Sequence, residues 1–132
     1  MAYTTINKPT DYFNTVLYAG DNATSNAITG VGFKPDWLWI RNRTATADFQ
    51  LSDIVRGKSG SLYYQIRTNA DGEQVVQPDN DGVSSLDSDG FTVGYTNSAA
   101  WNNSGNNYVS FSWLAGGSTS SNSDGSITST VS

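Results

Sequence analysis

Two short stretches of the chain space their aspartates in a way that could hold a hard cation. Asp79 and Asp81 precede one glycine, and Asp87 and Asp89 repeat this spacing before the next. Alternating oxygen ligands in a loop match the beginning of a calcium-binding loop. Neither stretch continues into the full twelve-residue pattern with its closing glutamate. Two hydrogen-bonded turns therefore explain these aspartates better than calcium does, and we expect no cofactor.

Carboxylates could also serve as the acid and base of a glycoside hydrolase. Such enzymes need two carboxyl groups across a cleft, one of them with a raised pKa. The chain has only one glutamate, Glu73, and most of its aspartates lie beside Gly, Asn or Ser. It has no histidine and no cysteine, so a histidine base, a thiolate nucleophile and a zinc–sulfur site are excluded. We therefore expect no enzymatic activity.

A tryptophan in the polar stretch 96–107 is the candidate for binding a glycan. An aromatic ring can stack on a sugar while amides and hydroxyls bind its hydroxyl groups. The candidate ligand residues are Trp101, Asn102, Asn103, Asn106 and Tyr95. The alternative is that the tryptophan folds back and closes the edge of the core, in an ordinary Asn-rich loop.

Two strands carry most of the aromatic residues. In 37–43, the period of two places Trp37, Trp39 and Arg41 on one face and apolar residues on the other. Residues 108–114 alternate similarly and place Phe111 and Trp113 on one face. Both faces of 37–43 are apolar at its centre. We expect either a strand between two layers or a strand that offers aromatic rings on one side. The three tryptophans and Phe111 are interpreted as core or subunit-interface residues. Arg41 and Arg43 are expected to pair with nearby aspartates or to cap a rim.

The composition favours an all-β fold. Ser, Thr, Asn and Gly make up 58 of 132 residues, and strong helix formers are scarce. Asp-Gly pairs at 71–72, 81–82, 89–90 and 124–125 mark turns between short strands. We expect strands at 12–18, 27–31, 37–43, 48–55, 62–67, 73–77, 83–86, 91–95 and 108–114. This pattern predicts an antiparallel β-sandwich of jelly-roll type at 11–117. An N-terminal arm at 1–10 precedes it. A flexible linker with a strand-like end follows at 118–132. We expect that end to pair with the domain or with a neighbouring subunit, or the chain to be the first unit of a longer protein.

The charge and the N-terminal segment limit the partners and the location. The net charge of −5 argues against binding to nucleic acid or to anionic membranes. The beginning of the chain has neither a basic region nor an apolar segment, so we expect no signal peptide and synthesis in a cytosol. A surface rich in Asn, Ser, Thr and Gly is nevertheless typical of exposed β proteins. A virion protein, made in the host cytoplasm and displayed on the particle exterior, satisfies both observations.

These motifs together resemble a family of marine bacteriophage virion structural proteins. The resemblance is carried by residues 11–20, 28–43, 51–57, 85–94, 108–117 and 123–132. It implies a concanavalin-like jelly-roll unit in a tail-fibre, receptor-binding or head-decoration protein, and it implies no catalytic residues. The expected partners are other virion proteins, further copies of the chain in a symmetric homo-oligomer such as a trimer, and a host surface glycan. The alternative function is a lectin-like domain that acts through the Trp101 loop.

Overall fold

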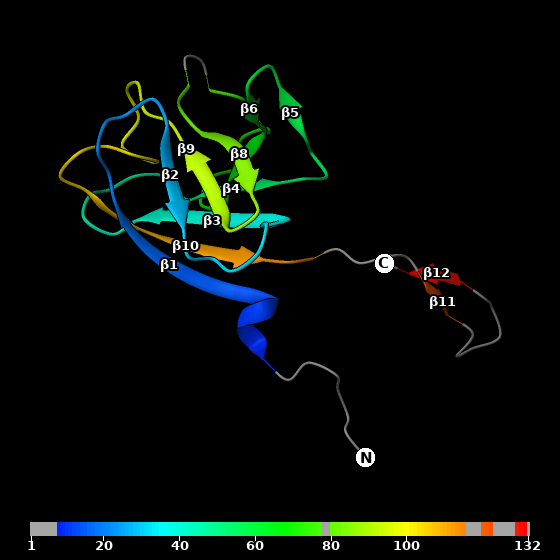
Figure 1. The fold of residues 1–132 in the computed structure, drawn as a ribbon. Coiled ribbons are helices and arrows are strands. Elements are labelled where there is room, and N and C mark those ends of the chain that lie inside the picture. The colour runs from blue at the N-terminus through cyan, green and yellow to red at the C-terminus, as the bar shows by residue number, and fades with distance from the viewer. Residues whose placement is uncertain (1–7, 78–79, 116–119, 123–128, 132) are drawn as a thin grey trace.

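The computed structural model describes residues 8–77, 80–115, 120–122 and 129–131, and nearly all regular structure in them is β. A five-stranded and a three-stranded antiparallel sheet form the body of the molecule (Figure 1). The prediction of an all-β antiparallel sandwich is confirmed. None of the helices among the described residues is long and apolar enough to cross a membrane.

The five-stranded sheet has the order β1-β10-β3-β4-β7. Its strands are β1 (Phe13–Ala19), β10 (Asn107–Trp113), β3 (Trp37–Asn42), β4 (Gln50–Asp53) and β7 (Gln65–Arg67). The register aligns Thr15, Phe111, Trp39 and Leu51 in one row across four strands. Because side chains alternate along each strand, every such row faces one side of the sheet.

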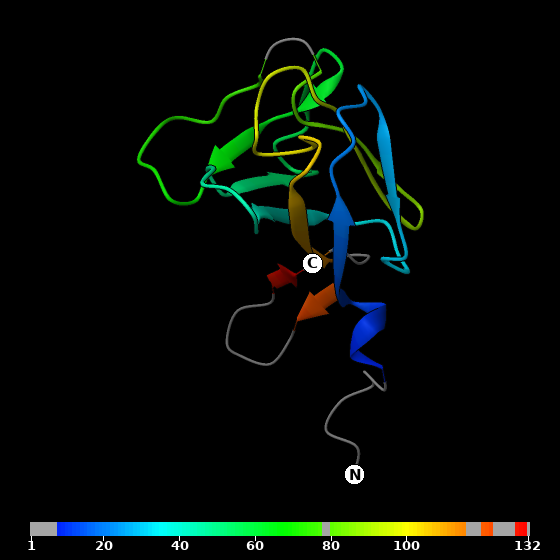
Figure 2. The same cartoon turned by 90° about the vertical axis from the view of Figure 1, so that its left-hand side faces the viewer.

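The core lies between the inner face of this sheet and the three-stranded sheet β2-β9-β8 (Figure 2). The smaller sheet consists of β2 (Asn26–Thr29), β9 (Gly90–Val93) and β8 (Val83–Asp87). Leu38 and Ile40 of β3 enter the core from one side, and Phe91 and Val93 of β9 enter it from the other. The period-two assignment of 37–42 is therefore correct: Leu38, Ile40 and Asn42 are buried there, whereas Trp37 and Trp39 are half-buried on the outer face.

Two tyrosines close the end of the core that lies opposite the chain's entry into the sheet. Tyr18 and Tyr108 are paired across β1 and β10 and stack with ring centroids 5.0 Å apart. The Tyr18 hydroxyl donates a 2.8 Å hydrogen bond to the backbone carbonyl of Trp101. Burial, and secondarily the nearby Tyr108, raise the pKa of Tyr18 well above its usual value of 10.0. Burial is also the main cause of the raised pKa of Tyr108.

The chain enters and leaves the sandwich side by side. A 3-10 turn, η1 (Pro9–Asp11), leads into β1, and the backbone N–H of Leu114 donates a 2.8 Å hydrogen bond to the Tyr12 carbonyl. In the next pair, Phe13 lies opposite Trp113. The 3-10 turn overlaps the end of the segment predicted as an arm.

Several predicted strands differ from the observed ones. The predicted strand 62–67 is interrupted at Tyr64 and becomes β6 (Leu62–Tyr63) and β7, with β6 paired to β5 (Lys58–Ser59). Segment 73–77 contributes a single bridge, Val75 to Gln65, because Gln65 and Val75 exchange only one pair of hydrogen bonds. Within the described residues the strand-like end does not pair with the sandwich: β12 (Ser129–Val131) pairs with β11 (Ser120–Asn122), inside the segment predicted as linker and extension.

Candidate functional site

The outer face of the five-stranded sheet carries two groups of contacting aromatic rings, together called the aromatic face here. It consists of Phe13, Trp37, Trp39, Phe49, Phe111 and Trp113. No element of the described part of the chain packs a second layer over it, and its rings are exposed or half-buried. Of the two arrangements predicted for strand 37–43, the one that offers rings on one side is therefore correct. The three tryptophans and Phe111 do not belong to the core.

One end of the aromatic face, the Trp37 end, is purely apolar at its centre. Trp113 lies between Phe13 and Trp37, with ring centroids 4.7 Å and 4.3 Å away. A hollow of about 270 Å³ is lined by Trp37, Trp113 and Ala115. A second hollow of about 290 Å³ adjoins Trp37 and extends to the turn that contains Val55, whose side chain is 91% exposed.

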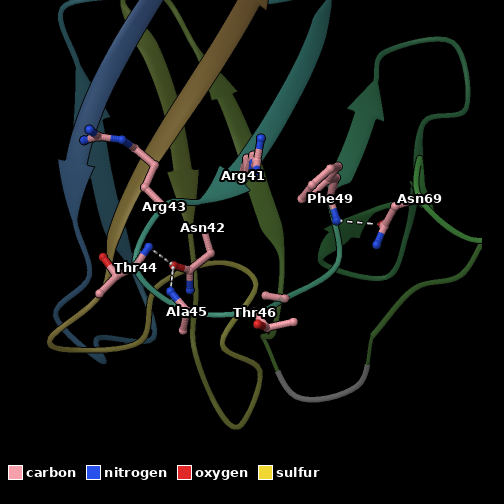
Figure 3. A pocket seen from close by; sticks show the side chains of 9 residues that line it. Arg41, Asn42, Arg43, Thr44, Ala45, Thr46, Phe49 and Asn69 are labelled. Atoms are coloured by element: carbon pink, nitrogen blue, oxygen red, sulfur yellow. Dashed lines mark hydrogen bonds between the residues drawn. The ribbon is translucent and has the colours of Figure 1, made fainter.

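The opposite end, the Arg41 end, combines aromatic rings with two arginines; Figure 3 shows Arg41 and Arg43 with one of these rings, Phe49. A hollow of about 350 Å³ is lined by Trp39, Arg41, Arg43, Val109 and Phe111. Arg41 and Arg43 also border a second hollow of about 360 Å³, which contains the hydroxyls and amide of Thr44, Thr46 and Asn69. The arginines therefore line both an aromatic hollow and a polar one.

The position of each group at the Arg41 end is set by local contacts. Asn42, on the inner face, accepts hydrogen bonds of 2.9 Å from the backbone N–H groups of Thr44 and Ala45, which shapes the turn after β3. The Asn69 side chain accepts a 2.9 Å hydrogen bond from the N–H of Phe49. The guanidinium carbon of Arg41 lies 4.5 Å from the centroid of the Phe49 ring, a cation–π contact.

The expected pairing of Arg41 and Arg43 with aspartates is not found. Among the described residues, the arginines in ion pairs are Arg56, with Asp53, and Arg67, with Asp48. Asp48 precedes Phe49 in the chain, but its carboxylate lies 3.3 Å from Arg67 across the β4–β7 pair. The structure thus leaves two arginine charges at one end of the aromatic face without a carboxylate partner among the described residues.

Trp101 does not offer a stacking surface for a glycan, and that prediction is wrong. Its side chain is only 1% exposed and belongs to the core cluster, so the fold-back alternative is correct. Asn102 is 0% exposed and serves as a connector. Its Nδ2 donates to Asp21 Oδ1 at 2.7 Å and to the Ala23 carbonyl at 3.0 Å, and its Oδ1 accepts from Asn26 at 2.8 Å and from the Asp21 N–H at 3.2 Å.

The other candidate glycan ligands are used within the loop. Asn103 donates a 2.9 Å hydrogen bond to the Tyr95 hydroxyl, and its own backbone N–H donates to Tyr108 at 2.9 Å. Asn106 closes a turn through a 3.1 Å backbone hydrogen bond to Asn103. All three candidates, Asn103, Asn106 and Tyr95, are partly buried. These contacts hold the loop against the sandwich and do not form an open sugar-binding surface.

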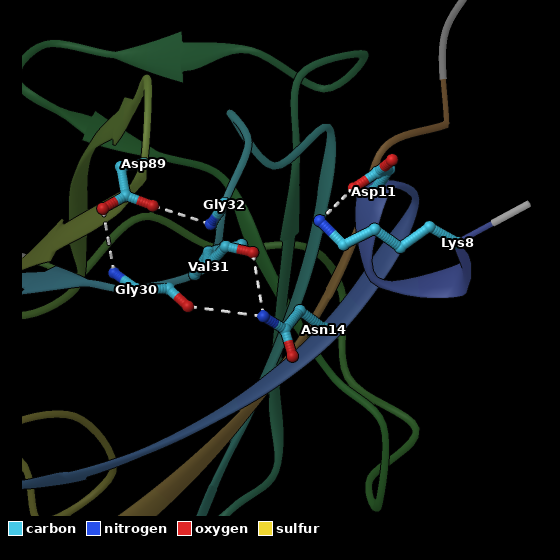
Figure 4. Close-up of polar contacts among 7 residues, drawn as sticks. All are labelled: Lys8, Asp11, Asn14, Gly30, Val31, Gly32 and Asp89. Atoms are coloured by element: carbon cyan, nitrogen blue, oxygen red, sulfur yellow. Dashed lines mark hydrogen bonds and ion pairs between the residues drawn. The ribbon is translucent and has the colours of Figure 1, made fainter.

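The aspartates proposed as weak calcium ligands bind protein donors. Asp89 accepts from the N–H groups of Gly30 and Gly32 at 3.1 Å and 2.7 Å, which fixes the turn after β2 (Figure 4). Asp81 accepts from the N–H of Thr96 at 3.0 Å, and Asp87 accepts from two hydroxyls on β8 and β9. Asp79 lies outside the described residues. Within the described ranges, no three acidic, cysteine or histidine side chains gather as a metal site would require.

A comparison with protein-family models finds one match. Residues 8–132 match the family described as "Domain of unknown function (DUF7483)". The chain belongs to this family. Comparisons of this DUF7483 chain with curated proteins and with solved structures find no match.

The site residues that sequence reasoning missed in this DUF7483 domain are Phe49 and Asn69. The even spacing of Trp37, Trp39 and Arg41 marked the correct face of β3, but the two missing residues come from the flanks of neighbouring strands. The available signal was Phe49 itself, an aromatic residue near the start of the predicted strand 48–55, the strand that follows the arginines of 37–43 in the chain. What the assembled face can do is bind, since it joins flat apolar rings to unpaired positive charge.

Proposed function

We propose that this chain is a non-catalytic structural module of a bacteriophage virion that mediates assembly and surface attachment. In this proposal the strands follow a jelly-roll order, and the chain is made in the host cytoplasm and displayed on the particle exterior. We favour a place in a tail fibre or receptor-binding protein over capsid decoration. The sequence resemblance supports the virion assignment, and the described aspartates, which bind backbone and hydroxyl donors, suit a role without catalysis.

The observation that carries the proposal is the aromatic face. A sheet face of a monomeric protein is normally covered or polar, and a contiguous exposed apolar patch marks a surface for partners. Here three tryptophans and two phenylalanines on β1, β3 and β10 form two groups of contacting rings on one face, and no second layer lies over them within the described chain. A binding module needs such a surface, whereas a free-standing scaffold would gain solubility by removing it.

We assign assembly to the Trp37 end, with a second copy of the chain as the partner. Val55 projects into solvent at the same end as the apolar hollow of about 270 Å³ that Trp37, Trp113 and Ala115 line, so each copy offers both an apolar knob and an apolar hollow. Such a pair of complementary features allows symmetric association. The exposed apolar neighbour Ile54, at 43% exposure, extends the same surface.

Immunogold labelling of intact particles tests the virion role. Antibodies raised against the chain should label the particle exterior, on the tail if the favoured placement is correct. Purified particles that lack the chain would overturn the virion assignment. Labelling confined to the capsid would replace the tail assignment with decoration.

Light scattering on the purified chain tests the assembly surface. The wild-type chain should give the mass of a small symmetric oligomer, and Val55→Ser should shift it toward the monomer. Leu17→Ser is the matched control, because Leu17 is also exposed, at 61%, but lies at the other end of the same sheet face. A monomeric wild-type chain, or equal effects of the two variants, would refute assembly through the Trp37 end.

A further inference from the structure

The Arg41 end of the aromatic face has the composition of a ligand site and differs from the Trp37 end in its charge. It brings Trp39 and Phe111 together at 5.3 Å, with their rings tilted by 35°, beside two arginines. The four arginines of the chain are all described, and the ion pairs in the described residues engage Arg56 and Arg67. Two positive charges at one end of one face are conspicuous in a chain with a net charge of −5.

The groups at this end are held in place before any ligand arrives. The indole N–H of Trp39 donates a 3.1 Å hydrogen bond to the Thr68 hydroxyl, and its ring contacts Phe49 edge-on at 6.3 Å. Arg41 is stacked over Phe49 at 4.5 Å, which leaves the edge of its guanidinium group for a partner. A preorganised site of this kind loses little conformational entropy when it binds.

We infer that the Arg41 end binds an acidic saccharide, and this inference rests on the attachment role proposed above. A pyranose ring stacks its C–H face on Trp39 and Phe111, and its carboxylate binds Arg41 and Arg43. A guanidinium group matches a carboxylate with two parallel hydrogen bonds, the geometry in which arginine is stronger than lysine. Thr44, Thr46 and Asn69 line the adjoining hollow of about 360 Å³. Thr44 already accepts from Asn107, and Asn69 accepts from Phe49 and donates to Asp48, so Thr46 is the hydroxyl of this set that has no hydrogen bond among the described residues and can serve a sugar hydroxyl.

The volume and the charge favour this ligand over a nucleic acid strand. The two hollows, of about 350 Å³ and 360 Å³, share Arg41 and Arg43 as a common border and together suit a short run of sugar units. A nucleic acid strand would also stack on aromatic rings, but it needs a positively charged groove along its backbone. Seven basic against twelve acidic residues do not supply that groove.

The position of the site also fits attachment. The strand register puts Phe13, Trp113 and Trp37 at the end where the chain enters and leaves the sheet, and Arg41 at the other end. At about 3.3 Å per residue, Trp37 and Arg43 lie about 20 Å apart along the strand direction. Assembly at one end therefore leaves the arginine end open to a surface polysaccharide.

The test uses the full chain and a set of matched oligosaccharides. Tetrasaccharides of β-1,4-linked mannuronic acid and of glucuronic acid, and an oligomer of N-acetylneuraminic acid, are compared with neutral β-1,4-mannotetraose and cellotetraose by calorimetry and tryptophan fluorescence. We expect at least one acidic probe to bind and its neutral counterpart to bind at least tenfold more weakly. Raising the salt concentration should weaken binding of the acidic probe, because salt screens exposed charges.

Variants assign the binding to named groups. Arg41→Gln should weaken binding of the acidic probe at least tenfold. It should leave the circular dichroism spectrum unchanged, because the side chain of Arg41 is exposed. Trp39→Ala should abolish binding altogether. Lys34→Gln is the control for net charge, because Lys34 is exposed but does not border either hollow, and it should bind as the wild type does.

Four results would overturn the inference. The first two are that no acidic probe binds at millimolar concentration, or that neutral counterparts bind equally well. The other two are that Arg41→Gln binds the acidic probe as the wild type does, or that a single-stranded oligonucleotide binds more tightly through Arg41 and Trp39. The particle labelling described above separates this failure from failure of the proposed function. A chain found on the virion that ignores acidic sugars refutes the site alone, whereas one that binds them but is absent from particles refutes the virion role alone.

Discussion

Replacing the buried Asn102 with alanine should destabilise the whole sandwich. The side chain is 0% exposed and makes four hydrogen bonds, of 2.7, 3.0, 2.8 and 3.2 Å, to the segment 21–26. It thereby ties the Trp101 loop to the connection between β1 and β2, some 80 residues earlier in the chain. Four bonds at about 1 kcal/mol each give an upper value of about 4 kcal/mol. Asp21 is exposed, and Ala23 and Asn26 are half-buried, so water can satisfy part of what is lost.

We therefore expect Asn102→Ala to lower the free energy of unfolding by about 2.5 kcal/mol. Urea unfolding followed by tryptophan fluorescence measures this change, because Trp101 is buried beside the mutated position and reports the loss of the core. Asn97→Ala is the control: Asn97 is exposed in the same loop and should change stability by less than about 0.5 kcal/mol. A loss below about 1 kcal/mol for Asn102→Ala, or equal losses for both variants, would refute the connector role.

An isosteric variant separates hydrogen bonding from packing. Asn102→Asp keeps the size of the side chain but turns its Nδ2 donor into an acceptor that faces Asp21 Oδ1 and the Ala23 carbonyl. At pH 7 it should be less stable than Asn102→Ala, because an unpaired buried charge costs more than a small cavity. The loss should shrink as the pH falls, since a protonated carboxyl regains a donor. A pH-independent loss would indicate that packing alone matters.

Three further predictions concern the core and the second sheet. The pKa of Tyr18 is raised in the folded state, so the contribution of Tyr18 to stability is complete below the unfolded pKa near 10 and is lost as the pH rises above that value. Absorbance at 295 nm should therefore show ionisation of Tyr18 only together with loss of the circular dichroism signal. Ionisation of Tyr18 before unfolding would contradict this. Tyr18→Phe should cost about 1 kcal/mol in urea unfolding, because the carbonyl of Trp101 loses its 2.8 Å partner, and an unchanged midpoint would contradict this. Gly94→Ala should lower the free energy of unfolding, measured by thermal unfolding, by about 2 kcal/mol or more, because a Cβ at this position would lie 2.0 Å from the backbone oxygen of Asn80. Gly72→Ala is the control and should be neutral, because the space around Gly72 is open. Equal effects of the two variants would show that the backbone at Asn80 moves to accept the added methyl group.

The sequence pattern was sufficient to assign the two faces of β3. The alternation in 37–42 correctly assigned Leu38 and Ile40 to the inner face and the tryptophans to the other. It could not decide whether the tryptophans were covered, because that depends on what packs over the sheet. Strand β4 defeats the same reasoning: all four of its residues are buried, although Gln50, Ser52 and Asp53 are polar.

The candidate site was harder to predict because its decisive contacts are long-range. Trp101 stands among asparagines, which indicates a solvated loop, yet Tyr18 holds its backbone from 83 positions away. For Arg41, an aspartate seven residues later was a plausible partner, but β4–β7 pairing brings Arg67 to Asp48 instead. Local composition contains no information about either choice, since both are made by the order of strands in the sheet.

The side-by-side crossing of the chain at Tyr12 and Leu114 determines how the domain bears mechanical load. Tension that pulls these two crossings apart would peel β1 from β10, breaking their hydrogen bonds one after another, beginning at the Phe13–Trp113 pair. Tension between the crossings and the Arg41 end instead runs parallel to the strands, so that the bonds of the β10–β3 ladder, which join the strand of Arg41 to the strand that ends beside Leu114, resist together. The domain should therefore yield at low force when the crossings at Tyr12 and Leu114 are pulled apart. It should resist higher force when it is held at these crossings and pulled by a ligand at the Arg41 end.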